Sequence, residues 1–450
     1  MSTSAFRLLF TRLLFTCLLL TLAVAVPAAA HARVGEKGPI SRIEFTGNER
    51  TQEIMLRRVM NLAEGDTLDA DRMDAAWDAL EDCGWFRYVD LVSEPDDNGG
   101  MVLSVTVEED MTTYYGPLLR HSRRHKYLLG GWLEERNLRG SGQTLRFELS
   151  AWRLQMAGAE WRVPWLAGVR GLTGTVGLRG EQADFVYRPT RYRKWDASLG
   201  ARWNFRGPLF VQTDVRHGRF SQRDSYDWTL PSRGGAVIAA LVEHPAGSQD
   251  HWRLAGGVGL DSRDNPFYPL SGAQVLVEAA RWYGDGFADY DEYTGDARAF
   301  IPLPAGKHLL ALRGWGRRVS GPTQLDNVIF LGGPETIRGA GFGSLEGEEG
   351  WLLTAEYRLP LVLVPIAPGG ESVGLGLHAF VDGGQAWYDG ADPGNPVVTW
   401  GAGTHLSLDT WQLRFEAARD EAGDWHFEFA DRFAFFATAR ARVPQASLLP

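Results

Sequence analysis

A glycine-rich stretch, "FLGGPETIRGAGFGS" from Phe330 to Ser344, combines five glycines with a single arginine, Arg338. The backbone N–H groups of such a loop can cradle a phosphate when a helix follows, and a guanidinium can pair with carboxylates. No helical pattern follows Gly343, so the phosphate interpretation fails. Two interpretations stay open: a flexible turn, or a loop folded into the protein and held there.

Other residue types with chemical potential do not form a catalytic pattern. The chain has no G-x-S-x-G, no H-E-x-x-H and no Cys/His set at zinc spacing, and its ten histidines are scattered. We therefore predict no enzyme, no cofactor and no metal site. The formal charge of −10 gives no support to nucleic-acid binding, so we expect no nucleic-acid partner.

The N-terminus has the layout of a secretory signal peptide over Met1–Ala32. Arg7 and Arg12 precede the apolar run "LLFTCLLLTLAVAV", and "PAAAHA" offers a small-residue cleavage site. A membrane anchor is the alternative, but the run is short for a spanning helix. Export follows, and the mature chain keeps Cys83 alone, which rules out a disulfide framework.

An N-terminal module is predicted over residues 38–110. Its expected elements are a strand, two helices and two strands, in the runs "ISRIEF", "TQEIMLRRVMNL", "DADRMDAAWDALEDCG", "FRYVDLVSE" and "MVLSVTVEE". In the second helix Met73, Ala76, Trp77 and Leu80 recur at three-to-four spacing and form one apolar stripe. Trp77 and Cys83 are interpreted as core residues. The result is a small β-α-α-β-β domain of α+β class.

Short alternating runs fill residues 127–433. In "QTLRFELSAW", Leu145, Phe147 and Leu149 fall on one face while Arg146 and Glu148 fall on the other. About sixteen such runs start at "KYLLGGWLEERNL", include "GGAVIAALVEH" and end at "DWHFEFADRF", and the glycine-rich loop joins the eleventh to the twelfth. An even number of strands with many aromatics near their ends is typical of a membrane barrel.

The predicted fold class is therefore mainly β, a transmembrane antiparallel β-barrel preceded by the small α+β domain. Residues 111–126 are expected to be a linker and residues 434–450 a C-terminal tail. The soluble alternatives are a β-sandwich or a propeller. No motif recurs at a blade period of about forty residues, and soluble sheets have little use for aromatics at so many strand ends.

Specific motifs make both parts resemble known families. The "I-x-F-x-G-N" of Ile43–Asn48 and the "GWF" of Gly84–Phe86 are similar to a POTRA domain, the periplasmic module of outer-membrane assembly barrels. The barrel resembles the surface-antigen domain of that superfamily, which includes the BAM and TAM barrels and the two-partner secretion pores. The stretches that carry this likeness are "ERNLRGSGQTL", "DSRDNPFYPLSG", "FLGGPETIRG" and "FVDGGQAW".

The resemblance implies a loop inside the barrel, anchored by an arginine on an acidic wall residue. The residues that match this lumen latch are Arg338, Gly339, Phe342 and Asp382. Further positions that match family motifs are Asp261, Arg263, Asp264, Gly332, Gly333 and Glu356. The family usually has an aromatic directly after the Arg-Gly pair, whereas here Ala340 and Gly341 precede Phe342. That aromatic contact is therefore expected to be shifted.

The resemblance also implies a function in the bacterial outer membrane, with the POTRA domain in the periplasm. We expect an assembly or translocation factor whose partners are unfolded outer-membrane or exported client proteins, membrane lipid, and a periplasmic or inner-membrane protein at the POTRA domain. Client docking is assigned to the module's last strand, at Val102, Leu103, Val105 and Val107. A dedicated two-partner-type secretion pore and a plain porin or structural barrel are the alternatives.

Overall fold

A computed structural model describes most of the chain after the predicted signal peptide. It covers residues 38–97, 99–122, 126–151, 154–184, 190–223, 226–228, 242–244, 247–264, 268–285, 287–304, 308–322, 327–341, 343–365, 372–408 and 411–430. The signal peptide Met1–Ala32, Phe342 of the lumen latch and the tail 434–450 lie outside these ranges. Within them, no helix has the length and apolar character that a membrane crossing requires.

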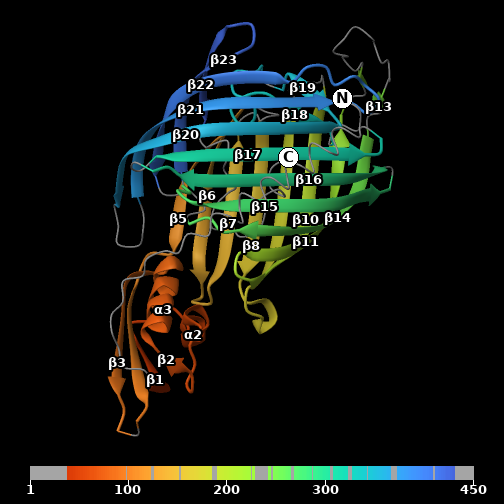
Figure 1. Cartoon of the computed structure of the whole chain (residues 1–450). Helices are drawn as coiled ribbons and strands as arrows, with labels where there is room; N and C mark the ends of the chain where they lie inside the picture. The colour runs from red at the N-terminus through yellow and green to blue at the C-terminus, as the bar shows by residue number, and fades with distance from the viewer. Residues whose placement is uncertain are drawn as a thin grey trace.

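The N-terminal module has the element order that the sequence predicts, with one addition, the two-residue strand β2 between the helices. Its elements are β1 (Gly38–Thr46), α2 (Glu53–Met60), β2 (Thr67–Leu68), α3 (Ala70–Asp82), β3 (Phe86–Pro95) and β4 (Met101–Glu109). The strands form a sheet in the order β2-β1-β4-β3, in which β1 and β4 run parallel and the other pairs antiparallel. In Figure 1 this module projects from one end of the larger sheet.

The module closes around an apolar core between its helices and its sheet. Helix α3 begins at Asp69, whose carboxylate accepts a hydrogen bond from the backbone N–H of Arg72 at 3.0 Å. Ala76 and Leu80 of this helix are fully buried, as their spacing predicts. The prediction that Trp77 is a core residue is wrong, because its side chain is 36% exposed and its indole N–H donates to the Val89 carbonyl at 3.1 Å. An amphipathic indole of this kind sits at the margin of a core rather than inside it.

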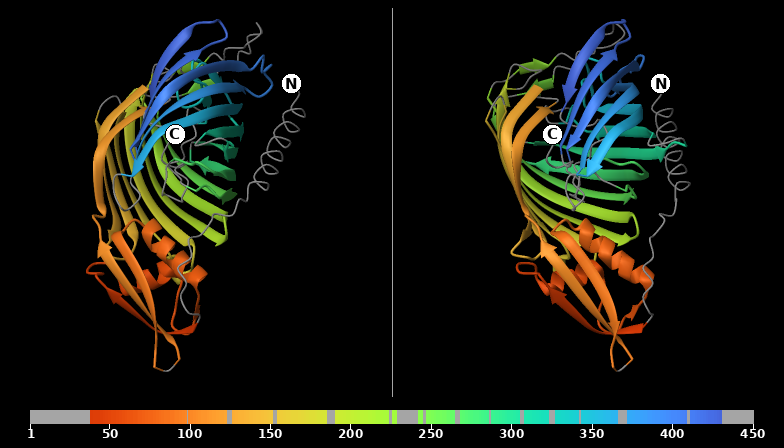
Figure 2. Two further views of the ribbon diagram at one scale, coloured as in Figure 1. Left: turned by 60° about the vertical axis from the view of Figure 1, so that its left-hand side comes forward. Right: turned by 90° about the vertical axis from the view of Figure 1, so that its left-hand side faces the viewer.

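Sixteen of the described strands form one antiparallel sheet that curls into a barrel-like wall (Figures 1 and 2). They are β5 (Thr113–Ser122), β6 (Lys126–Leu138), β7 (Gln143–Ala151), β8 (Leu154–Val163), β9 (Leu172–Asp184), β10 (Arg191–Arg206), β11 (Leu209–Gln222), β14 (Gly247–Asp261), β15 (Gly272–Gly284), β16 (Phe287–Pro302), β17 (Leu309–Ser320), β20 (Glu349–Pro365), β21 (Ser372–Trp387), β22 (Val397–Leu408), β23 (Trp411–Arg419) and β24 (Trp425–Ala430).

The total of sixteen agrees with the sequence prediction because two errors cancel. The expected linker 111–126 contains β5, which pairs with β6 from Thr113↔Glu135 to Ser122↔Lys126 and is the first strand of the sheet. The run "GGAVIAALVEH" is predicted as a strand of the sheet. Its residues 234–241 lie outside the described residues, and its described end, β13 (Val242–His244), pairs with β12 (Tyr226–Trp228) in a separate hairpin. The glycine-rich loop therefore does join the eleventh strand, β17, to the twelfth, β20.

The wall alternates between an apolar outer face and a polar inner face. On β7, Phe147 and Leu149 are 43% and 63% exposed, whereas Glu148 and Ser150 between them are buried. The exposed side chains of this strand are apolar and the buried ones are polar, which is the reverse of the pattern in a water-soluble sheet. The alternation predicted for this strand is confirmed.

The sheet has two edge strands, β5 and β24. Among the described residues no backbone pairing joins them, so the order runs from β24 to β5 without closing. Figure 2 shows the blue last strands coming round towards the orange first strands. The gap between these edges is called the seam below.

The module is fixed to the end of the barrel by specific hydrogen bonds. Asn137 Nδ2, near the end of β6, donates to Thr51 Oγ1 at 2.9 Å, and the Gln52 N–H donates to the Gly140 carbonyl in the β6–β7 connection at 2.9 Å. A Cβ on Gly142 would lie 2.7 Å from the Trp85 ring and 2.8 Å from Met55 of the module core. The two parts therefore meet at backbone distance at one end of the barrel, which is called the module end below.

Candidate functional site

The described residues of the connection between β17 and β20, 321–322, 327–341 and 343–348, fold into the barrel and are called the latch loop. Its strands β18 (Ile329–Leu331) and β19 (Leu345–Gly347) pair antiparallel, and a compact turn lies between them. The Gly332 N–H donates to Thr336 Oγ1 at 2.9 Å, and the Gly333 N–H donates to the Ile337 carbonyl at 3.1 Å. Gly332 and Gly333 have φ of 111° and 97°, which side-chain-bearing residues rarely adopt.

Arg338, at the tip of the latch loop, is fully buried against acidic groups of the wall. Its Nε and Nη2 donate to the two carboxylate oxygens of Asp382 at 2.7 and 2.9 Å, and its backbone N–H donates to the same carboxylate at 3.1 Å. The guanidinium carbon also lies 3.5 Å from the centroid of the Phe380 ring. The contact between Arg338 and Asp382 is the one that the sequence predicts, while its role as a latch stays a prediction.

Two more carboxylates surround the same guanidinium. Nη1 of Arg338 donates to Glu356 Oε2 at 2.5 Å and to Glu416 Oε1 at 2.9 Å. Arg358 pairs with Glu356 at 2.7 Å, and Arg414 pairs with Glu416 at 2.7 Å. Three arginines thus balance three carboxylates in a buried cluster, which is the condition under which buried charges are tolerated.

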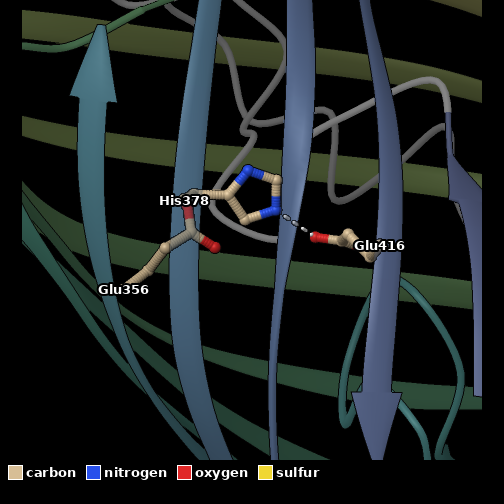
Figure 3. A group of neighbouring side chains, drawn as sticks. All are labelled: Glu356, His378 and Glu416. Carbon is tan, nitrogen blue, oxygen red and sulfur yellow. Dashed lines mark hydrogen bonds and ion pairs between the residues drawn. The ribbon is translucent and has the colours of Figure 1, made fainter. Parts of the chain in front are cut away.

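The ligand types and spacing of Glu356, His378 and Glu416 suit a metal ion, since their ligand atoms lie within 4.8 Å of one another. Figure 3 shows the three side chains on strands β20, β21 and β23, with the imidazole directed at Glu416. Nη1 of Arg338, however, already donates to both carboxylates, and Arg358 and Arg414 add two more positive charges. The cluster therefore fits an arginine side chain as its cation better than a metal ion.

A chain of hydrogen bonds continues from this cluster towards the module end of the barrel. His378 Nε2 lies 2.8 Å from Glu416 Oε1, its Nδ1 lies 3.2 Å from Nδ1 of His405, and His405 Nε2 lies 2.9 Å from the Tyr268 hydroxyl. Tyr268 belongs to the β14–β15 turn, in the motif "DSRDNPFYPLSG". This turn and the latch loop therefore enter the barrel from opposite ends and meet one hydrogen-bonded network.

The remaining family-motif residues shape that turn. Arg263 pairs with both oxygens of Asp261 at 2.8 and 2.9 Å, and the Asp264 carboxylate accepts from the N–H groups of Leu270 and Ser271 at 3.0 and 3.1 Å. These contacts give the three residues a structural role and place them outside the arginine cluster.

Apolar side chains of the latch loop pack in two directions. Ile329, Leu331 and Ile337 join a buried cluster with Leu352 of β20 and Val397 of β22. The alternate residues Val328 and Phe330 belong to a second cluster across the lumen, together with Leu118, Leu154, Met156, Ala183, Tyr192, Phe220 and Tyr388. The latch loop therefore spans the lumen and fills the part of it distant from the module.

The predicted client-docking residues are not at a sheet edge, which is a correction. Strand β4 lies between β1 and β3, so its backbone groups are paired on both sides. Leu103, Val105 and Val107 are buried in the core, and Val102 is half-buried. The edge strands of this sheet are β2 and β3. The alternating pattern indicates a strand but not its place in the sheet.

Six members of the lumen network are not among the residues predicted from the sequence: Tyr268, Arg358, His378, His405, Arg414 and Glu416. The members that lie on strands could have been found from the alternation of side chains between the two faces of each strand. His378 lies four residues before Asp382 on β21 and therefore faces the same side, and Arg358 follows Glu356 by two. Charged residues that share parity with a predicted lumen residue are candidates for the same network.

Comparisons with known proteins agree with this architecture. Residues 137–424 match the Omp85 superfamily domain, and residues 39–110 match the POTRA family described as surface antigen variable number repeat. No curated protein matches the chain.

Solved structures that are similar to the chain include two kinds of outer-membrane barrel, BamA and CdiB. A BamA structure from Haemophilus ducreyi lacking POTRA domains 1–3 has a TM-score of 0.65 at 15% identity, covering 88% of this chain and 84% of that one. CdiB from Acinetobacter baumannii has a TM-score of 0.56 at 14% identity, and the match covers 87% of this chain and 73% of that one. CdiB from Escherichia coli has a TM-score of 0.53 at 13% identity, and the match covers 96% of this chain and 98% of that one. At these identities the likeness concerns the fold.

Proposed function

The chain belongs to the Omp85 superfamily of outer-membrane transport and assembly barrels, and from this premise we propose that it inserts client proteins into the outer membrane at its seam. In this proposal the periplasmic POTRA domain receives an unfolded client, and the barrel templates the client's strands. The observation that carries the proposal is the seam itself.

The seam presents two strand edges without a pairing partner among the described residues. Strand β24 is held to β23 over six residue pairs, from Arg414↔Ala430 to Arg419↔Trp425. Unpaired N–H and C=O groups in hydrocarbon carry a free-energy penalty of several kcal/mol each. A client strand that pairs with such an edge removes the penalty, so client folding can supply the driving force in the absence of a nucleotide site.

The filled lumen favours the seam as the client's route. The latch loop packs Val328 and Phe330 against the far wall, and Arg338 fixes its tip in the arginine cluster. Passage of a polypeptide through the lumen would require these contacts to break together. Insertion at the seam leaves all of them in place.

For the POTRA domain we propose that clients add to the edge of β3. This strand has ten residues, Phe86–Pro95, and pairs on one side with β4. Strand addition gives affinity through main-chain hydrogen bonds and therefore accepts many sequences. Strand β2, at the other edge, has two residues and offers little length for this purpose.

The proposal is tested by locking the seam in purified protein reconstituted in liposomes. Cysteine pairs, one in Thr113–Ser122 and one in Trp425–Ala430, are screened for disulfide formation in a Cys83→Ala background. A urea-denatured eight-stranded outer-membrane barrel serves as the client, and its gain of heat-resistant, protease-protected form is the readout. We expect insertion to stop on oxidation and to recover on reduction.

The matched control is a pair of cysteines on β10 and β11 at Leu199 and Val215, which are register partners away from the seam. Oxidation there should leave insertion unchanged. Continued insertion with an oxidised seam would refute the proposal and would favour a secretion pore that uses the lumen. If removal of residues 38–110 also leaves the client unaffected, a plain barrel is the better description.

A further inference from the structure

The latch loop bonds directly to one side of the seam and shares a buried apolar cluster with the other side. On one side, Glu428 of β24 accepts a hydrogen bond through Oε1 from the backbone N–H of Gly339 at 3.1 Å. On the other side, Leu118 of β5 shares a buried apolar cluster with Val328 and Phe330. These contacts lie inside the barrel, whereas the backbones of β24 and β5 do not pair in the described chain.

We propose that the latch loop straps the seam together, with Glu428 and Leu118 as the residues that position the two edge strands. The inference rests on the proposed function for its consequence, since a strapped seam limits when the edges are available to a client. It predicts, independently of any client, that loosening either end of the strap lets the edges separate.

The β24 end of the strap is rigid because Gly339 adjoins Arg338. Arg338 is held by Asp382, Glu356 and Glu416 within 2.5–2.9 Å. Gly339 has φ of 81°, and a Cβ at this position would lie 2.8 Å from the Cβ of Ala418 on β23. A displacement of β24 that keeps the Glu428 bond therefore has to move the arginine cluster.

The β5 end depends on the two faces of β18. Val328 and Phe330 point to the cluster that contains Leu118, and Ile329 and Leu331 point to the cluster on β20 and β22. Leu118 is only 4% exposed although it lies on an edge strand. The loop thus connects β5 across the lumen to the wall that also holds Arg338.

A strap of this kind acts in series, and this sets it apart from independent packing effects. If either end is released, the other end no longer links the two edges. The separation of β5 from β24 should therefore change as much in a single variant as in the double variant. Independent effects at two distant sites would instead add.

The experiment measures the distance between spin labels on the outer faces of the two edge strands. Tyr115→Cys and Phe427→Cys carry the labels, because these side chains are 78% and 84% exposed, and Cys83→Ala removes the competing thiol. The variants are Glu428→Ala, Phe330→Ala and their combination, in lipid nanodiscs without client. Loss of one such contact should raise the population of longer distances roughly three- to tenfold.

Two controls separate the strap from general destabilisation. Glu428→Gln keeps an acceptor oxygen for Gly339 and should restore the parent distances. Glu278→Ala, on β15, breaks an ion pair with Arg253 of β14 and a 2.9 Å hydrogen bond from Gln212 of β11. These three strands lie away from the seam. Glu278→Ala should lower the temperature of barrel unfolding without lengthening the distance.

Folding of every variant is checked by the heat-dependent gel shift of the barrel. Unchanged distances in folded Glu428→Ala and Phe330→Ala would overturn the proposal, as would additive effects in the double variant or equal lengthening in Glu278→Ala. Because no client is present, each of these outcomes leaves the seam-insertion assay free to succeed or fail by itself.

Discussion

The POTRA domain and the barrel bury opposite kinds of residue. The POTRA core consists of apolar side chains such as Leu56, Ala76, Leu80 and Leu103, each with no exposed surface. The barrel interior has Arg338, Arg358 and Arg414 with 0–1% exposure, balanced by carboxylates that are equally buried. The two regions alternate in the same way along their strands, but the apolar face points inward in one and outward in the other.

The difference follows from the solvent on each side of the sheet. The POTRA sheet has water on its outer face, so burial of apolar surface drives its folding. The barrel has lipid outside, where an apolar side chain gains little from moving inward, and its polar groups have to find partners in the lumen. Burial therefore identifies the core of the POTRA domain, whereas in the barrel it identifies the ion-pair network.

The sharpest way to break this comparison is to remove the central cation of the barrel. Arg338→Ala leaves Asp382 and parts of two other carboxylates buried without their partner, so we expect a loss of about 3–5 kcal/mol in barrel stability. The measurement is the temperature at which the folded barrel loses its faster migration in a detergent gel. The matched control is Arg281→Ala, which removes an exposed arginine paired with Asp289 and Asp291 at 3.0 and 3.1 Å.

An exposed pair contributes about 0–1 kcal/mol, so the control should shift the transition little. If Arg338→Ala and Arg281→Ala shift it equally, the lumen network does not stabilise the barrel as the comparison requires.

In the POTRA domain the corresponding change is apolar. Leu80→Ala opens a cavity beneath α3 and should destabilise this domain by roughly 2–5 kcal/mol. Hydrogen exchange over residues 38–110 of the full protein reports the effect, and the gel transition of the barrel should stay unchanged. Ile54→Ala, at a side chain that is 49% exposed, is the control and should have little effect. Equal protection in the two variants would contradict the assignment of Leu80 to the core.

The sequence predicts the fold well where a pattern is local. The element order of the POTRA domain, apart from β2, and the alternation of β7 follow from periodicity, whereas the number of strands before the glycine-rich loop is right only because two errors cancel. The first strand of the sheet, β5, is not predicted because it contains Gly116 and Pro117 and has charged residues near its end. Such a composition is more typical of a linker. The pairing of β5 with β6 is a tertiary fact that no local pattern contains.

The site was predictable only as far as the family motif extends. The motif and the position of Asp382 predict the contact with Arg338, but they do not predict Glu416 or His405, which come from strands far away in the sequence. The order of strands in the POTRA sheet cannot be predicted from the sequence pattern either. The pattern therefore assigns client docking to β4, which in fact lies between β1 and β3. Long-range register decides both cases.

A third prediction compares the introduction of an arginine on the lipid-facing side of the barrel with the same change on the water-facing side of the POTRA domain. Leu199 on β10 and Val92 on β3 are both exposed, at 62% and 44%. Leu199→Arg places a charge on the lipid face and should reduce barrel stability by about 2–4 kcal/mol if the position lies near the bilayer midplane. Val92→Arg places it in water and should change POTRA stability by less than about 0.5 kcal/mol. Similar penalties at both positions would show that the barrel face is not in lipid.

The smallest expected effect concerns the junction between the POTRA domain and the barrel, where a carboxylate stabilises the POTRA domain by accepting hydrogen bonds from the backbone. The carboxylate of Glu109, at the end of β4, accepts from the N–H groups of Arg50 and Thr51 at 3.0 and 2.6 Å. Thr51 in turn holds Asn137 of the barrel. Burial alone would raise the pKa of Glu109, but the hydrogen bonds from Thr51 and Arg50 outweigh it and lower the pKa below its ordinary value of 4.5.

A lowered pKa in the folded state means that Glu109 stabilises the junction above the unfolded pKa and ceases to do so as the pH falls through the folded pKa. Glu109→Gln should therefore reduce POTRA stability by about 1–3 kcal/mol at pH 7, and by less at pH 3, where the parent has lost the same interaction. Urea unfolding followed by tryptophan fluorescence, with Trp85 close to the junction, measures both values. The parent midpoint should fall between pH 7 and pH 3 more steeply than that of the variant. Parallel pH profiles would show that the junction, like the rest of the POTRA core, is held by apolar contacts and not by this carboxylate.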